Sequence, residues 1–181
     1  MRILGVDPGL SLTGFGCLEF PGGDVALPAR VADAGVIRLP GKRTVSHRLA
    51  MLERELSALV EELRPSYACV ESVFSHVVHP RTAIVMGHAR GVILLVIERS
   101  GVPLIELPPA EVKKSLTGSG RASKEQMQRA IAGALGLSAP PQPADVADAL
   151  AVALAGSVRL HAAEAMEPRG VELKQRGTGG V

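Results

Sequence analysis

The sequence is poor in aromatic residues and in cysteine. Among 181 residues there are three Phe, one Tyr and no Trp, so a folded core must be built almost entirely from aliphatic side chains. The two cysteines, Cys17 and Cys69, both lie in apolar runs, and no CxxC pair is present. This spacing excludes the common cysteine metal and redox motifs and predicts two buried free thiols.

Long apolar runs and an excess of charge of one sign are also missing. The nearest candidate for a membrane span, residues 91–98, is far too short to cross a bilayer, and no signal peptide precedes the first predicted strand. The chain has 20 Lys and Arg against 18 Asp and Glu, so a basic surface would require local clustering. The expectation is a cytoplasmic globular protein that does not enter a membrane.

Hydrophobic periodicity predicts a single α/β domain over residues 1–160. Three strand-like runs at 2–7, 12–20 and 31–39 are joined by short connections and predict an antiparallel meander. Two further strands are predicted at 66–72 and 102–107, and helices at 44–63, 82–99, 109–116, from Ser123 onwards and at 144–160. Helices that alternate with strands after a meander imply a five-stranded mixed sheet flanked by helices. Residues 161–181 are polar and are expected to form a disordered tail.

Four carboxylates stand at the ends of predicted strands or helices. Asp7 ends the first strand, directly before Pro8, and Glu71 ends the fourth. Ligands of open α/β sheets bind beyond the carboxyl ends of the strands, so these two acids are expected at one edge of the sheet. Asp145 and Asp148 lie three residues apart, on one face of the first turn of the last helix.

Each of these acids has an ordinary explanation when it is taken alone. Asp before Pro-Gly is common in turns, and Asp in the first turn of a helix complements the helix dipole. If all four converge, however, their mutual repulsion requires a nearby cation. Ligand sets made only of oxygen atoms suit Mg²⁺ or Mn²⁺, and a pair of such ions supports phosphodiester hydrolysis.

Five segments, in this order and spacing, resemble the RuvC family of Holliday junction resolvases. They are GVDPGLSLTGFG, VESVF, GHARGV, VKKSLTGSGRASKEQM and PADVADALAVAL, and the resemblance spans about residues 2–160. It implies a ribonuclease H-like fold and a homodimeric endonuclease that makes paired symmetric nicks in four-way DNA junctions during recombination and repair. It also implies some preference for the cleaved sequence and cooperation with the RuvA and RuvB branch-migration complex.

The resemblance assigns the four acids as catalytic metal ligands. Asp7 is then the central ligand, Glu71 and Asp145 complete two Mg²⁺ or Mn²⁺ positions, and Asp148 holds or orients a ligand water. Some relatives have histidine at the position of Asp145, so this chain carries the all-carboxylate set. Ser72 follows Glu71 where the family often has glutamine, a departure that concerns strand handling rather than the chemistry.

A cluster of basic residues around two glycines is the predicted DNA contact. The cluster consists of Lys113, Lys114, Arg121 and Lys124, beside the helix that Ser123 begins. Such residues would position phosphates without reading the base sequence. Phe74 matches an aromatic of the family that stacks on bases, although an aromatic that anchors a loop to the core would have the same pattern. Arg81 and Arg90 are weaker candidates for DNA contact.

The helix around Gly87, Ala89 and Gly91 is slim enough to admit a second helix. The resemblance places this helix at a homodimer interface, and a two-fold dimer suits a junction with two equivalent strands. The histidines near it, His76, His79 and His88, form no recognisable ligand set, and their roles stay open.

Three alternative functions are consistent with part of the sequence. The segments GVDPG and TGFG also resemble the first phosphate loop of actin-like ATPases, but the chain is too short for their second domain and lacks their second glycine-rich loop. A non-catalytic junction-binding protein would keep the basic cluster without needing the acids. An RNA-directed nuclease would share the fold without needing Phe74 or the dimer helix.

Overall fold

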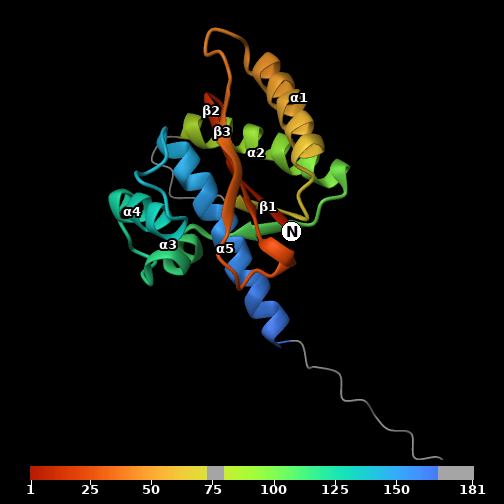
Figure 1. The fold of residues 1–181 in the computed structure, drawn as a ribbon. Helices are drawn as coiled ribbons and strands as arrows, with labels where there is room; N and C mark the ends of the chain where they lie inside the picture. The colour runs from red at the N-terminus through yellow and green to blue at the C-terminus, as the bar shows by residue number, and fades with distance from the viewer. Residues whose placement is uncertain (73–79, 167–181) are drawn as a thin grey trace, which may run out of the picture.

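The computed structural model describes residues 1–72 and 80–166, and it contains one mixed sheet (Figure 1). The strands are β1 (Arg2–Asp7), β2 (Leu12–Glu19), β3 (Arg30–Arg38), β4 (Tyr67–Glu71) and β5 (Leu104–Leu107). The helices are α1 (Val45–Leu63), α2 (Pro80–Ser100), α3 (Pro109–Thr117), α4 (Lys124–Ala134) and α5 (Ala144–Met166), with a short 3₁₀ helix, η1, at Pro21–Gly23. The strand order β3-β2-β1-β4-β5 confirms the predicted five-stranded sheet.

Strand β1 is the centre of the sheet and has different neighbours on its two sides. It pairs antiparallel with β2, which pairs antiparallel with β3, and it pairs parallel with β4, which pairs parallel with β5. Ile3 and Leu4 point to opposite faces and are both fully buried, which explains the nearly continuous apolar run of this strand. The carboxyl ends of β1, β4 and β5 therefore lie at the same edge.

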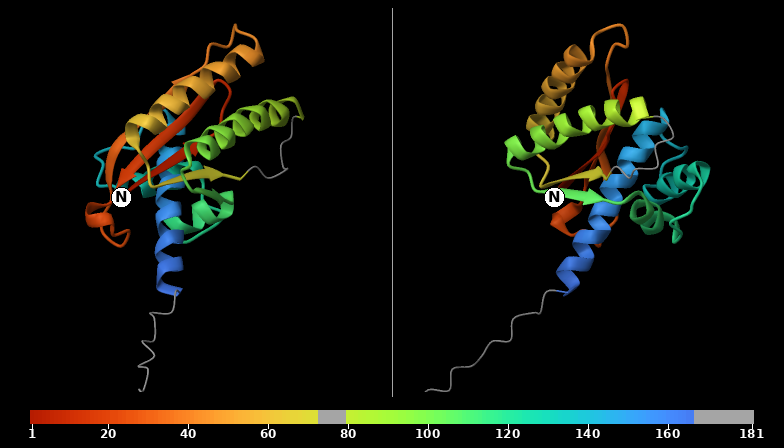
Figure 2. Two further views of the ribbon diagram at one scale, coloured as in Figure 1. Left: turned by 90° about the vertical axis from the view of Figure 1, so that its right-hand side faces the viewer. Right: turned by 180° about the vertical axis from the view of Figure 1, so that it is seen from behind.

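Helices cover both faces of the sheet (Figures 1 and 2). Helices α1 and α2 pack on the face that carries Leu4 and Val6, whereas α5, with α3 and α4 beside it, packs on the face that carries Ile3 and Cys69. Both cysteines are buried and free, as predicted, and burial raises the pKa of Cys17 to about 11 and of Cys69 to about 12. The two aliphatic cores sandwich the sheet and hold its edges in place.

Helix α5 lies unusually close to strands β1 and β2 because glycines face it. A Cβ atom added to Gly5 would lie 2.1 Å from the carbonyl oxygen of Ala149, and one added to Gly14 would lie 2.1 Å from that of Asp145. Gly5 pairs with Gly16 across the two strands, which extends the same gap. Because only glycine leaves this space, the backbone of α5 rests directly on the sheet.

Helix α5 is also longer and more central than the sequence suggested. It extends to Met166, six residues past the predicted end, and all six added residues are exposed. The rest of the predicted tail, 167–181, lies outside the described residues, so the division into a domain and a tail stays a prediction. By length and composition α5 alone among the described helices is apolar enough to span a membrane, but 56% of that stretch is buried inside the domain, as in a core helix.

Replacement of Gly14 by alanine should test the close packing of α5. The added methyl group would overlap the backbone of Asp145, so we expect a loss of about 1 to 3 kcal/mol in the free energy of unfolding. The matched control is Gly133→Ala in α4, where an added Cβ meets nothing within 4 Å. That variant should be neutral or slightly stabilised. Equal urea midpoints for the two variants would contradict the packing account.

Candidate active site

The loop after Asp7 is held by two side chains from other elements. The hydroxyl of Thr13, which is fully buried, donates to the carbonyl oxygen of Gly9 at 2.5 Å. Arg48 of α1 donates to the carbonyl oxygen of Leu10 and, at 3.1 Å, to the hydroxyl of Ser11. These contacts fix the chain directly beyond β1, so the Asp7 carboxyl group keeps its place at the end of the strand.

Glu71 lies beside Asp7 because β4 pairs with β1. The register sets Val6 opposite Val70, so the two acids follow at the same edge of the sheet. Beyond Glu71, the backbone N–H of Ser72 donates to the carbonyl oxygen of Leu107 at 2.8 Å. The parallel pairing thus confirms the predicted meeting of two acids that are far apart in the sequence.

The other two acids come from the first two turns of α5, which crosses the sheet near this edge. Asp148 lines a pocket of about 220 Å³ together with Asp7 and Glu71, and the lining also includes Val112 and Met127. Asp145 is not among the residues that line this pocket, although its backbone packs against Gly14 of β2. The structure therefore brings three of the four predicted acids into one pocket and places the fourth next to them.

Burial and mutual repulsion both act on the carboxyl groups. Burial, followed by the charges of Asp148, Glu71 and Asp145, raises the pKa of Asp7 to about 7, and Lys124 opposes this shift. Burial and then the charge of Asp148 raise the pKa of Glu71, while Lys113 opposes the shift. The site therefore has more negative charge than its own lysines compensate.

Two of the four predicted DNA-contacting cations reach this pocket. Lys113 of α3 and Lys124 of α4 line it, and the Lys124 Nζ atom lies 3.2 Å from Oδ2 of Asp148. The hydrogen bond and the charge of Asp148 raise the pKa of Lys124, so this ammonium is charged. Lys114 and Arg121 are exposed and do not line the pocket.

Four of the residues singled out in the sequence lie wholly or partly outside the described residues. Phe74, with His76 and His79, lies outside the described residues, as does the side chain of Arg81.

The capping box predicted at Ser123 is present: its hydroxyl accepts from the backbone N–H of Gln126, and its own N–H donates to the Gln126 side chain. One of the amides expected to face a phosphate is therefore already bonded.

Arg90 has a different environment from the one the sequence suggested. Its side chain is only 17% exposed and forms an ion pair with Glu106 of β5, and its Nε atom donates to the carbonyl oxygen of Glu71 at 3.4 Å. Arg90 therefore ties α2 to the ends of β4 and β5 rather than standing free for DNA. A sign of this role in the sequence is Glu106, an acid inside the short apolar strand at 104–107. The partner of Glu106 could not be identified before the order of the strands was known.

The donor set of the pocket fits a hard divalent cation. Asp7, Glu71 and Asp148 offer only carboxylate oxygen atoms, the ligands preferred by Mg²⁺ and Mn²⁺. Burial and then the neighbouring carboxylates raise the pKa of Asp7, so a cation bound here would favour its ionised form. Within residues 1–72 and 80–166, however, no three His, Cys, Asp or Glu side chains are already grouped as metal ligands. Asp148 is instead paired with Lys124.

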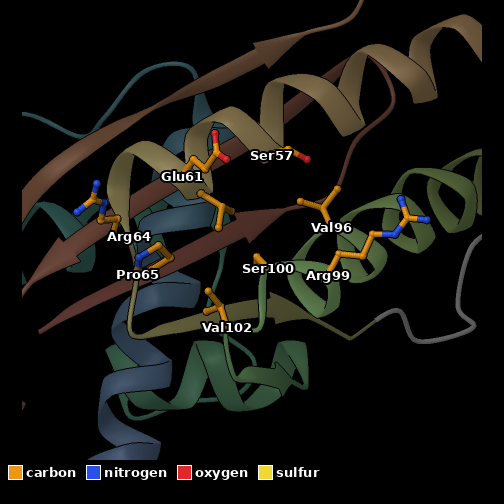
Figure 3. Close-up of a pocket in the computed structure, with 9 residues that line it drawn as sticks. Ser57, Glu61, Arg64, Pro65, Val96, Arg99, Ser100 and Val102 are labelled. Carbon is orange, nitrogen blue, oxygen red and sulfur yellow. The ribbon is translucent and has the colours of Figure 1, made fainter.

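A second cavity, of about 570 Å³, opens at the opposite ends of β4 and β5 (Figure 3). It lies between the last turns of α1 and α2 and is lined by residues that include Val60, Val96 and Val102. Glu61 is its only acid among the lining residues, and Arg64 and Arg99 point away from each other at its two sides. This cavity lacks the clustered carboxylates that distinguish the smaller pocket.

The strand order and the acidic edge define the class of the protein. A meander followed by parallel strands, with acids at the carboxyl ends of β1 and β4 and a helix carrying further acids across them, is the architecture of ribonuclease H-like nucleases. The solved structure of Thermus thermophilus RuvC in complex with a Holliday junction substrate superimposes with a TM-score of 0.82 at 29% identity, covering 90% of this chain and 96% of that one.

Comparison of sequences identifies the particular family. The family described as crossover junction endodeoxyribonuclease RuvC matches residues 3–156. A protein of that name from Synechococcus sp. is 40% identical over 156 residues, which cover 86% of this chain and 97% of the relative. Another from Rhodopirellula baltica is 44% identical over 154 residues, 85% of this chain and 84% of the relative. The chain belongs to the RuvC family of crossover junction endodeoxyribonucleases.

Replacement of Asp7 by asparagine should change how stability depends on pH. The pKa of Asp7 is about 7 in the folded protein against an ordinary value of 3.8, so the folded state binds this proton more tightly. Wild-type stability should therefore fall as the pH rises through this interval, and the loss should persist above it. In metal-free buffer near pH 8, Asp7→Asn should be more stable than wild type by on the order of a few kcal/mol.

The advantage of Asp7→Asn should disappear near pH 3, below the ordinary pKa of 3.8, where this position is neutral in the folded and the unfolded states of both proteins. Urea unfolding at several pH values measures the difference. Asp33→Asn, at an exposed position of β3, controls for the loss of a charge elsewhere. An Asp7→Asn variant that is no more stable than wild type near pH 8 would contradict the proposed electrostatic strain.

Proposed function

We propose that this chain is a Holliday junction resolvase that hydrolyses one phosphodiester bond in each of two opposed strands of a four-way DNA junction. The observation that carries this proposal is the pocket where acids from β1, β4 and α5 meet between two lysines. Carboxylates at this edge suit metal-assisted hydrolysis, and the lysines suit the phosphates of the substrate. Membership of the RuvC family and the likeness to a RuvC bound to a Holliday junction support the same substrate.

Asp7, Glu71, Asp145 and Asp148 would hold the catalytic divalent ions, which we propose to be two Mg²⁺ or Mn²⁺ ions. When bound, such ions activate a water molecule and stabilise the leaving oxygen. Asp7 is the best-placed ligand of the set, because its charge interacts with those of all three other acids.

The lysines of the pocket would position the DNA backbone. Lys113 faces Glu71 from α3 and Lys124 faces Asp148 from α4, so a phosphate between them would lie directly above the acids. Lys114 is exposed on α3, and Arg121 is exposed on the loop between α3 and α4. Both side chains would extend the contact along the DNA strand. These contacts give salt-dependent affinity without base specificity. Base stacking by Phe74 stays a prediction.

We also propose that the protein acts as a homodimer through α2. The exposed side of this helix carries Ile84 and Leu95, which are 59% and 45% exposed, with Gly87, His88 and Gly91 between them. These residues recur at helical spacing and form a narrow face of small and apolar residues, with His88 among them, on which a second copy of α2 would pack. Two sites related by a two-fold axis would then cut the two opposed strands. Cooperation with RuvA and RuvB and a cytoplasmic location stay predictions.

Cleavage of a synthetic four-way DNA junction tests the proposed function. The purified protein should produce paired symmetric nicks with Mg²⁺ or Mn²⁺, none with a chelator, and far fewer in linear duplex DNA. Asp7→Asn and Asp148→Asn should each slow cleavage by at least about 100-fold, since each removes a ligand charge. Both variants should still bind the junction, because the basic residues are retained. Asp33→Asn should cleave as wild type does.

Three outcomes of this assay would contradict the proposal in different ways. Tight junction binding without cleavage under any metal would support a non-catalytic junction-binding protein. Preferential cleavage of a matched junction in which RNA strands replace the DNA strands would support an RNA-directed nuclease of the same fold. Unchanged cleavage by Asp7→Asn would show that the pocket is not the active site. Gel analysis of junctions labelled on each strand in turn distinguishes these results.

A further inference from the structure

One ion pair occupies the proposed metal pocket. Lys124 contacts Asp148 at 3.2 Å between Nζ and Oδ2, and no other ion pair of the described chain involves an acid of this pocket. The lysine side chain is 58% exposed, whereas that of Asp148 is 35% exposed. The Lys124 ammonium therefore reaches into the pocket from the more exposed side. It lies beside the Asp148 carboxylate, which would also attract a second cation.

The backbone of Lys124 is fixed while its side chain is free to turn. Lys124 is the first residue of α4, directly after Ser123, whose capping box with Gln126 holds the start of that helix. Packing of Met127 and Ile131 in the core anchors the helix below it. The long side chain can consequently leave Asp148 without any movement of the helix.

We propose that Lys124 competes with the divalent cation for Asp148 in the free protein, so that the ion pair raises the metal concentration at which the site fills. This inference rests on the proposed function, because it takes the acidic pocket as the metal site. The ammonium occupies one lone-pair site of Oδ2 and repels a second cation placed beside that oxygen atom. Both oxygen atoms of Asp148 are therefore fully available to the metal only in the fraction of molecules whose ion pair is open.

The chain offers a matched control for this competition in Lys113. Lys113 lines the same pocket and faces Glu71, yet it forms no ion pair with a described acid. Removal of either lysine removes one positive charge from the pocket, but only removal of Lys124 also frees a carboxylate oxygen atom from an ion pair. Comparison of the two variants thus separates direct competition from general electrostatic repulsion of the metal.

Binding of Mn²⁺ to the free protein, measured by electron paramagnetic resonance without DNA, tests the inference. Lys124→Met should bind Mn²⁺ about fivefold more tightly than wild type, as expected from loss of a partly exposed ion pair. Lys113→Met should gain less than about twofold. Lys124→Arg, which keeps the charge at the same place, should remain close to wild type.

Unchanged or weaker Mn²⁺ binding by Lys124→Met would overturn the inference, and so would an equal gain in Lys113→Met. Asp7→Asn distinguishes this failure from failure of the proposed function. If wild type binds Mn²⁺ and Asp7→Asn does not, the pocket is the metal site, and only the competition is then in question. If the two proteins bind Mn²⁺ equally, the pocket is not the metal site and the proposed function itself fails.

Discussion

The close approach of α5 to β1 and β2 is the constraint on which the rest of the structure depends. Gly5 and Gly14 leave room for the backbone of the helix, so the acids of its first turns come within reach of the acids at the strand ends. Side chains at these two glycine positions would lift the helix off the sheet. The same packing covers one face of the sheet, so the fold and the site share one physical cause.

The acidic pocket destabilises the folded protein locally, and the packing of the rest of the fold offsets this loss. Burial and neighbouring charges make ionisation of Asp7 unfavourable, and the two aliphatic cores provide the stability that holds the group in place. Such strained electrostatics are typical of functional sites, where a bound cation or substrate supplies the missing charge. Lys113 and Lys124 supply only part of it, from helices that approach the pocket from one side.

Much of this architecture could be predicted from the sequence, because aliphatic patterns identify strands and helices well in a chain with so few aromatics. The acids at 7 and 71 could be placed at one edge because parallel strands align their carboxyl ends. Other features depend on contacts between distant segments that no local pattern reveals. The ion pair of Arg90 with Glu106 could be found only once α2 and β5 were known to be neighbours. The last turns of α5, up to Met166, fall at the start of the segment that the sequence predicts as a tail.

The central claim is that divalent cations bind where β1, β4 and α5 bring their acids together. The most direct test is X-ray diffraction from crystals of the protein grown with Mn²⁺, with data collected at the manganese absorption edge. The account predicts anomalous density within bonding distance of carboxylate oxygen atoms of Asp7, Glu71 and the acids of α5. Anomalous density confined to other parts of the molecule, at a Mn²⁺ concentration that supports junction cleavage, would contradict it.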